Sequence, residues 1–213
     1  MSQEIIKLML QGIEETFYMV AVATVIGGII GIPLGITLVT TSKGHILENR
    51  FINQILGTIV NIIRSIPFII LMVAIIPLTR LIAGTSIGTT AACVPLTIVA
   101  IPFLSRLVET SIRDVDFGLV EAAESMGATP FQIIRKVLIP EALPTIINNI
   151  TVLIVNLIGA SAMAGAIGGV GGFMAQSMTD YTFYNYRVAL LFFAVLALGA
   201  SFARLAEQEV EDR

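Results

Sequence analysis

The side chains that most often do chemistry are sparse in this sequence of 213 residues. Its single cysteine, Cys93, cannot form an internal disulfide, and a lone histidine, His45, cannot build a zinc site with it. The glycine-rich stretch 165–172 suggests a phosphate loop, but no lysine of the chain follows a glycine, as a Walker A motif requires. The sequence therefore predicts no metal site, no cofactor bound by this chain and no nucleotide hydrolysis by it.

The charged residues gather in one segment. Nine of the 27 charged side chains fall between positions 109 and 141, although apolar segments flank that region on both sides. Each charge costs about 2.5 to 3.5 kcal/mol at the centre of a membrane helix, so the region cannot lie in hydrocarbon. We expect a loop in water over about residues 109–142. Its charged members are Glu109, Arg113, Asp114, Asp116, Glu121, Glu124, Arg135, Lys136 and Glu141.

The first half of this loop has the pattern of a short helix. Asp116 can cap its beginning, and Phe117, Val120 and Ala123 repeat every three residues as an apolar stripe. Gly127 is expected to end the helix in a left-handed conformation. A short amphipathic helix that projects from a membrane protein is well suited to docking in a groove of another protein.

The second half predicts another short helix. Thr129 and Gln132 stand at the spacing of a capping box, with a proline at the first helical position. Lys136 falls in the expected last turn, where the helix dipole favours cations. Pro140 and Pro144 are expected to bracket the return of the chain into the membrane.

The rest of the chain has the composition of a membrane protein. Hydrophobic residues make up 56% of the sequence, charged residues 13%, and the mean hydropathy is +0.93. Several stretches approach the roughly 20 apolar residues that a membrane-spanning helix needs. We predict an all-α membrane protein with one domain, residues 1–213, and no affinity for nucleic acid, since no basic stripe is present. The five expected transmembrane helices are about 16–40, 51–79, 87–108, 143–164 and 187–205.

Two local patterns predict how the spans are built. Gly27, Gly31 and Gly35 recur every four residues and form a ridge of small residues against which another helix can pack closely. Pro67 lacks a backbone donor and biases Ile66 away from helical angles, so we expect a kink in the second span.

The loop and its borders resemble a known family, the permease subunits of bacterial ABC importers, and in particular their EAA loop. More narrowly, residues 61–88 and 126–144 look like the permease of the methionine importer, and the resemblance covers about residues 10–195. The matching motif residues are Glu121-Ala122-Ala123, Gly127 four residues later, Ile139-Pro140 and Leu143-Pro144.

This resemblance implies that the first short helix is a coupling helix, which sits in a cleft of a separate cytoplasmic ATPase subunit. It implies two copies of this chain, two ATPase subunits that bind ATP and Mg²⁺, and an extracytoplasmic substrate-binding lipoprotein. The substrate would be methionine, as the L and D enantiomers, imported by alternating access. The residues expected to dock on the ATPase or to shape the turn are Phe117, Val120, Glu121, Ala122, Ala123, Met126 and Gly127.

Two features of the spans are candidates for the transport path. Arg64 is a cation far from any loop, which either lines the path or, alternatively, snorkels to the headgroups or pairs with a carboxylate such as Glu109. The fourth span carries Asn149, Asn156 and Met163 at helical spacing. This stripe either faces the path or the partner permease, or it only makes hydrogen bonds between helices.

The distribution of cations predicts the orientation. With five spans, eight Lys or Arg residues lie on the side of the charged loop and three on the other, with Arg64 unassigned. Cytoplasmic loops are enriched in such residues, so we expect a cytoplasmic loop and C-terminus and an external N-terminus. The resemblance implies that the membrane is a bacterial inner membrane. The eight are Lys43, Arg50, Arg106, Arg113, Arg135, Lys136, Arg204 and Arg213.

Three other functions compete with import of methionine. A permease of the same type could carry another small amino acid or solute, since apolar walls with asparagines suit many. An ion-driven secondary transporter would want carboxylates within its spans, whereas every Asp and Glu falls near an expected end or loop. A membrane enzyme is disfavoured because no histidine, serine or carboxylate constellation converges within the spans.

Overall fold

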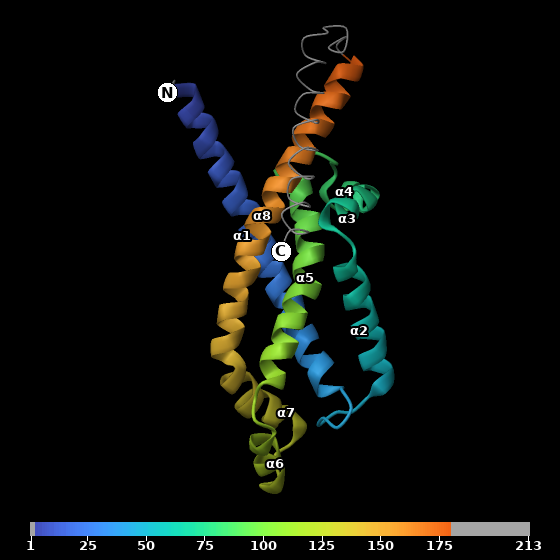
Figure 1. Ribbon diagram of the computed structural model, residues 1–213, viewed down its shortest axis with the longest axis vertical. Helices are drawn as coiled ribbons and strands as arrows, with labels where there is room; N and C mark the ends of the chain where they lie inside the picture. The colour runs from blue at the N-terminus through green and yellow to red at the C-terminus, as the bar shows by residue number, and fades with distance from the viewer. Residues whose placement is uncertain (1–2, 180–213) are drawn as a thin grey trace, which may run out of the picture. The chain divides into compact units, whose positions relative to one another are not determined.

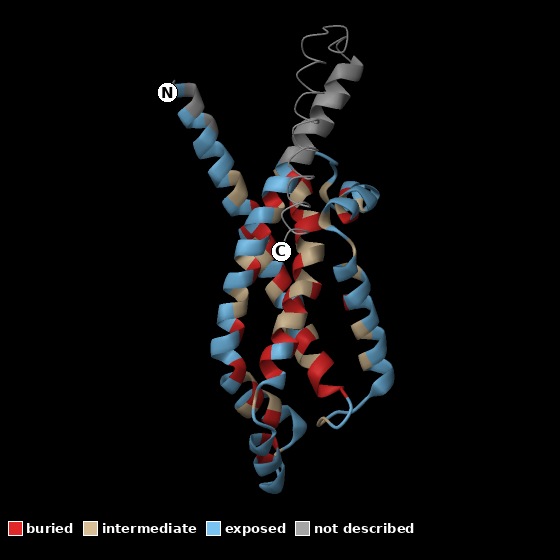
Figure 2. Ribbon diagram, viewed as in Figure 1, coloured by how far each residue is buried: buried red, intermediate tan, exposed pale blue. Residues whose placement is uncertain are grey.

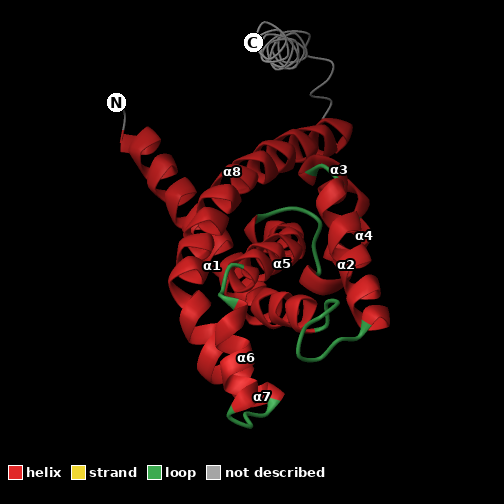
Figure 3. Cartoon of the chain, turned by 60° about the horizontal axis from the view of Figure 1, so that its bottom comes forward, coloured by secondary structure: helices red, strands yellow, loops and turns green. Residues whose placement is uncertain are grey.

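The structure, a computed structural model, describes residues 3–179, and the regular elements in this part of the chain are all helices (Figures 1 and 3). The chain divides into two units, Met1–Ala166 and Ile167–Arg213, and of the second only the end of α8 is described. The elements are α1 (Gln3–Thr40), α2 (Arg50–Ser65), α3 (Phe68–Ala74), α4 (Ile76–Ala83), α5 (Thr89–Arg113), α6 (Phe117–Ser125), α7 (Pro130–Ile133), a π-helix η1 (Ile134–Leu138) and α8 (Ile139–Thr179).

Three helical segments in the described part are long and apolar enough to cross a membrane. They are Met9–Thr40 in α1, Thr89–Arg113, which is α5, and Pro130–Gly165, which runs from α7 into α8. These segments overlap the first, third and fourth spans expected from the sequence, whose exact bounds stay predictions. The fifth expected span, 187–205, lies outside the described residues, so the number of five spans stays a prediction.

The second expected span, 51–79, is not one tilted helix. α2 ends at Ser65, Ile66 is extended with φ −86° and ψ 123°, and α3 begins after Pro67 at an angle of 103° to α2. The ring of Pro67 disfavours helical angles in the residue before it, and its nitrogen cannot donate to the helix. The expected kink is therefore a full break, and α2 with α3 is at most one broken span.

α1 and α5 pack along each other through the expected glycine ridge. A Cβ atom added at Gly27 would lie 2.8 Å from the Cβ atom of Ala100, and one added at Gly35 would lie 2.5 Å from the carbonyl oxygen of Ser105. These distances leave no room for a side chain, which confirms the close approach predicted from the sequence. On α5 the buried residues recur every four positions, as Leu96, Ala100, Leu104, Val108 and Ile112.

The charged loop folds locally as its capping residues predict. Oδ1 of Asp116 accepts a hydrogen bond from the backbone of Gly118 at 2.9 Å, at the start of α6. Gly127 has φ +80°, the left-handed region, and follows the last turn of α6. The backbone of Thr129 donates to the side chain of Gln132 at 2.9 Å, which is one half of the expected capping box.

The return of the chain from the loop, which Pro140 and Pro144 were expected to bracket, is one continuous run of helix. α7, η1 and α8 follow one another without a turn or coil residue, and both Pro140 and Pro144 lie inside α8. The π-helix contains an i to i−5 hydrogen bond from the backbone of Ile139 to the carbonyl of Ile134. A π-turn changes the hydrogen-bond register, so the helix can continue although Pro140 offers no N–H.

Candidate functional site

α6 is fixed to the rest of the chain through the buried side of its apolar stripe. Val120 is 1% exposed and Ala123 is 4% exposed, and both belong to a core cluster with Ile133 and Leu138. The proposed contact of Val120 with an ATPase is therefore corrected, because its side chain is already buried within this chain. Ala123 shapes the turn as expected, since its carbonyl accepts from the backbone of Ala128 at 3.1 Å.

The other side of α6 is open (Figure 2). Met126 is 82% exposed and Phe117 43%, and Glu121, Ala122 and Gly127 are also exposed. These five expected docking residues thus remain accessible to a partner.

One exposed apolar residue of α6 was missed from the sequence. Leu119 is 42% exposed and stands three residues before Ala122 and seven before Met126. This i, i+3, i+7 spacing places the three side chains on one helix face and could have revealed Leu119. α6 therefore has two apolar sides, one that anchors it and one that is free.

The loop between α1 and α2 contacts α6 at Phe117. The ring of His45, between α1 and α2, meets the ring of Phe117 edge to face, with centroids 5.8 Å apart. Burial, and then the nearby charge of Arg113, lower the pKa of His45 below its usual value. The neutral imidazole is therefore the favoured form against this helix.

A buried carboxylate lies at the end of α5 that leads to α6. Glu109, with 6% of its side chain exposed, accepts from Arg106 at 2.5 Å and from Arg113 at 2.9 Å. Arg106 also donates to Oδ1 of Asn61 on α2 at 2.7 Å. The suggested pairing of Arg64 with Glu109 is therefore wrong; Arg64 is exposed in the last turn of α2.

The asparagine stripe expected on the fourth span is divided between two roles. The side chain of Asn149 donates to the carbonyl of Leu107 at 3.2 Å and to the hydroxyl of Ser111 at 2.8 Å, both on α5. These hydrogen bonds favour the packing interpretation for Asn149, and its place in a transport path stays a prediction. Asn156 and Met163 instead line a surface hollow of about 810 Å³ with Phe68 of α3.

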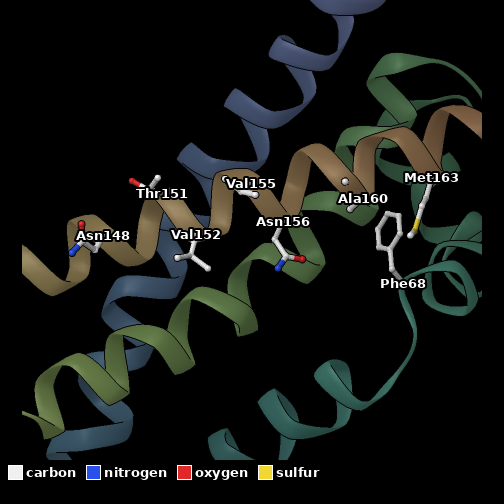
Figure 4. Close-up of a pocket in the computed structure, with 9 residues that line it drawn as sticks. Phe68, Asn148, Thr151, Val152, Val155, Asn156, Ala160 and Met163 are labelled. Carbon is white, nitrogen blue, oxygen red and sulfur yellow. The ribbon is translucent and has the colours of Figure 1, made fainter. Parts of the chain in front are cut away.

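This hollow is mostly apolar and follows one face of α8. Figure 4 shows Asn148 at one end, and Met163 with Phe68 at the other. Sequence reasoning missed Asn148 and Phe68, and Arg64 does not line the hollow. Asn148 stands eight residues before Asn156, so counting in fours back from Asn156 would have found it on this face, one position before Asn149.

Comparison with known proteins agrees with the fold. Residues 27–208 match the family described as binding-protein-dependent transport system inner membrane component. A probable D-methionine transport system permease protein, MetI, of Vibrio cholerae is 55% identical over 191 residues, covering 90% of this chain and 84% of that protein. The D-methionine transport system permease proteins MetI of Salmonella typhimurium and Escherichia coli K12 are each 49% identical over 165 residues, covering 78% of this chain and 76% of each relative.

Solved structures give the same result. A chain of the MetNI methionine ABC transporter in an inward-facing conformation is 43% identical, has a TM-score of 0.77, and is matched over 95% of both chains. A chain of an amino acid ABC transporter is 21% identical with a TM-score of 0.61, which supports the fold alone. Matches of this extent identify an all-helical membrane permease of the ABC importer type. This chain belongs to the binding-protein-dependent transport system inner membrane components, in the family that includes the D-methionine transport system permease proteins.

Proposed function

We propose that this chain is the permease subunit of an importer that carries methionine, as the L and D enantiomers, through the bacterial inner membrane. The observation that carries this proposal is the 55% identity to a D-methionine permease protein over 90% of the chain. Two copies of the chain would act with two ATPase subunits and receive substrate from an extracytoplasmic binding lipoprotein. ATP and Mg²⁺ would bind to the ATPase subunits, since this sequence has no Walker A motif.

α6 is the docking element in this proposal. Its free face offers Leu119, Ala122 and Met126 for a cleft of the ATPase, with Glu121 beside them. Its buried residues, Val120 among them, join α6 to the core that α5 and η1 also enter. Closure of the two ATPases on ATP would therefore displace a helix that is firmly attached to the membrane-embedded core, and would bias the permease between inward-facing and outward-facing states.

The hollow on α8 is the proposed wall of the transport path. Its side chains are mainly apolar, with the amides of Asn148 and Asn156 among them, which suits a thioether side chain joined to a polar amino acid head. The hollow is open along one face of α8, so a second copy of the chain would complete it. Five spans, an external N-terminus and a cytoplasmic C-terminus belong to this proposal.

Reconstitution in liposomes with a methionine-importer ATPase and its binding protein tests the function. We expect ATP-dependent uptake of labelled methionine, which excess unlabelled L- or D-methionine reduces. Uptake of other amino acids in preference to methionine would refute the substrate. Uptake by this chain alone, driven by a sodium or proton gradient, would refute the whole proposal.

A pair of variants tests the docking face. Met126→Glu places a charge on the free face of α6, and Phe131→Glu places the same charge on α7 at a similar exposure, 70% against 82%. We expect Met126→Glu to prevent co-purification of the ATPase and Phe131→Glu to retain it. Normal assembly and uptake with Met126→Glu would remove α6 from the interface.

A further inference from the structure

α2 has two chemically different sides along its whole length. One side carries only polar residues and a glycine, and the other carries apolar residues at the same depths. At 100° per residue, the polar members fall within one sector of the helix, and we call them the α2 polar stripe. The stripe consists of Arg50, Gln54, Thr58, Asn61, Arg64 and Ser65.

The α2 polar stripe is exposed at every one of its positions. The opposite side is exposed as well, with Phe51 at 73% and Ile62 at 55%, whereas Val60, between the two sides, is buried against the rest of the chain. α2 thus packs on the chain along a narrow line and presents an apolar and a polar side to its surroundings.

The membrane gives these two sides different neighbours. The 16 residues of α2 rise about 24 Å, most of the roughly 30 Å thickness of the hydrocarbon region. Lipid chains can cover the apolar side. They cannot cover two arginines and a row of amides and hydroxyls, so the polar stripe faces either water or protein.

The polar surface continues from α2 onto α5. Oδ1 of Asn61 accepts from Arg106, whose side chain is 29% exposed and is also paired with the buried carboxylate of Glu109. The cluster holds two arginines, Arg106 and Arg113, for one carboxylate, so it retains a positive charge. A partly exposed, uncompensated cation in this position requires water nearby.

The charge of the stripe argues against a contact with a second copy of itself. Arg50 and Arg64 are both cations, and α2 contains no Asp or Glu. Two stripes face to face across a two-fold axis would place four cations together without an opposite charge between them. Water, and a solute that carries a carboxylate, fit the stripe better than its own copy does.

We propose that the α2 polar stripe is a water-covered wall of the transport path, and that Arg64 is the fixed positive charge on it that the carboxylate of a zwitterionic amino acid meets during passage. This inference rests on the proposed function, because it takes α2 to lie in the membrane of a permease. It adds a second wall, opposite in chemical character to the mainly apolar hollow on α8.

Cysteine accessibility with neighbouring controls tests the wall. In a Cys93→Ala background, Gln54→Cys and Thr58→Cys place thiols on the stripe, and Ile55→Cys and Ile59→Cys place thiols on the apolar side at the same depths. The complete complex in proteoliposomes is treated with a charged, membrane-impermeant thiosulfonate. Since thiols in apolar surroundings stay protonated and inert, we expect the stripe positions to react about tenfold faster than their neighbours.

The possible results distinguish a failure of the α2 wall from a failure of the proposed function in methionine import. Equal rates within each pair, or faster reaction on the apolar side, overturn the wall while ATP-driven uptake by the background protein upholds the function. Absence of uptake by that background protein counts against the proposed function itself. A disulfide between the Thr58→Cys positions of two copies, with normal uptake, would assign the stripe to an interface.

The role of Arg64 has its own test. We expect Arg64→Gln to lower the rate of methionine uptake about tenfold, the effect of losing one charge-assisted hydrogen bond, and Arg64→Lys to restore most of it. ATP hydrolysis by the assembled complex should stay unchanged in both variants, which a merely structural role would not allow. Wild-type uptake by Arg64→Gln would exclude a contact with substrate.

Discussion

The glycine ridge between α1 and α5 gives the sharpest quantitative prediction, because one helix offers both a crowded and an open glycine. A Cβ atom at Gly35 would lie 2.5 Å from the carbonyl oxygen of Ser105 and 2.8 Å from the Cβ atom of Val108. A Cβ atom at Gly28 would meet no atom within 4 Å. Gly35→Ala and Gly28→Ala therefore make the same chemical change in two different environments.

The two variants should change stability in opposite directions. In a helix, alanine is favoured over glycine by about 1 kcal/mol, and at Gly28 nothing opposes this gain. At Gly35 the contact is with backbone and Cβ atoms, which cannot swing away, so we expect the upper end of the overpacking cost, about 3 kcal/mol. The net effects are about 1 kcal/mol stabilising at Gly28 and about 2 kcal/mol destabilising at Gly35.

Thermal unfolding of the detergent-purified complex, followed by fluorescence-detected gel filtration at one protein concentration, measures the difference. For a chain of this size each kcal/mol shifts Tm by about 2 to 4 °C, so the two variants should differ by about 6 to 12 °C. If Gly35→Ala proves as stable as Gly28→Ala, then α1 and α5 do not approach each other as closely as described, and the argument from small residues fails.

Three further predictions concern polar groups. Asn149→Leu should lower stability by about 0.6 to 1 kcal/mol and leave uptake intact, since its hydrogen bonds hold two helices together; lost uptake at unchanged Tm would contradict this. Glu109→Gln should lower the free energy of unfolding by about 2 kcal/mol, measured through the shift in Tm, because it breaks the ion pairs of a buried carboxylate with partly exposed partners. Arg113→Gln should lower it by less than about 1 kcal/mol, because the side chain of Arg113 is 52% exposed. Burial lowers the pKa of His45 in the folded chain, so the unfolded chain binds a proton at this residue more readily. The free energy of unfolding should therefore be highest above about pH 6.5 and fall as the pH drops below that value. His45→Phe should make stability less dependent on pH in this range.

Local sequence signals predicted the features that depend on neighbouring residues. The cap at Asp116 and the left-handed Gly127 follow from short-range steric and hydrogen-bond rules, which act whatever the rest of the fold does. The glycine ridge at Gly31 and Gly35 was also predictable, because a four-residue repeat fixes one helix face.

Features that depend on distant residues were harder to predict. A proline predicts that a helix is kinked or broken, but the 103° angle at Pro67 depends on the residues against which α3 packs. The roles of Asn149 and Asn148 differ by one position and about 100° of helix rotation, and the sequence does not say which side faces α5. The burial of Val120 likewise depends on the packing of α6 against η1.

The attachments of α6 explain how a displacement there could reach several helices at once. α6 packs on η1, and Val120 belongs to the buried core that also includes the end of α5, so a push on α6 can reach α5 through this core. The contact between Phe117 and His45 leads to the loop that connects α1 and α2. The two helices that this loop connects are joined to each other, since the side chain of Asn53 on α2 donates to the carbonyl of Leu38 on α1 at 2.6 Å. Because α6 is held by a buried apolar contact at Val120 and by a ring contact at Phe117, it cannot hinge freely on the loop. A force on its free face should therefore move the ends of α1, α2 and α5 together.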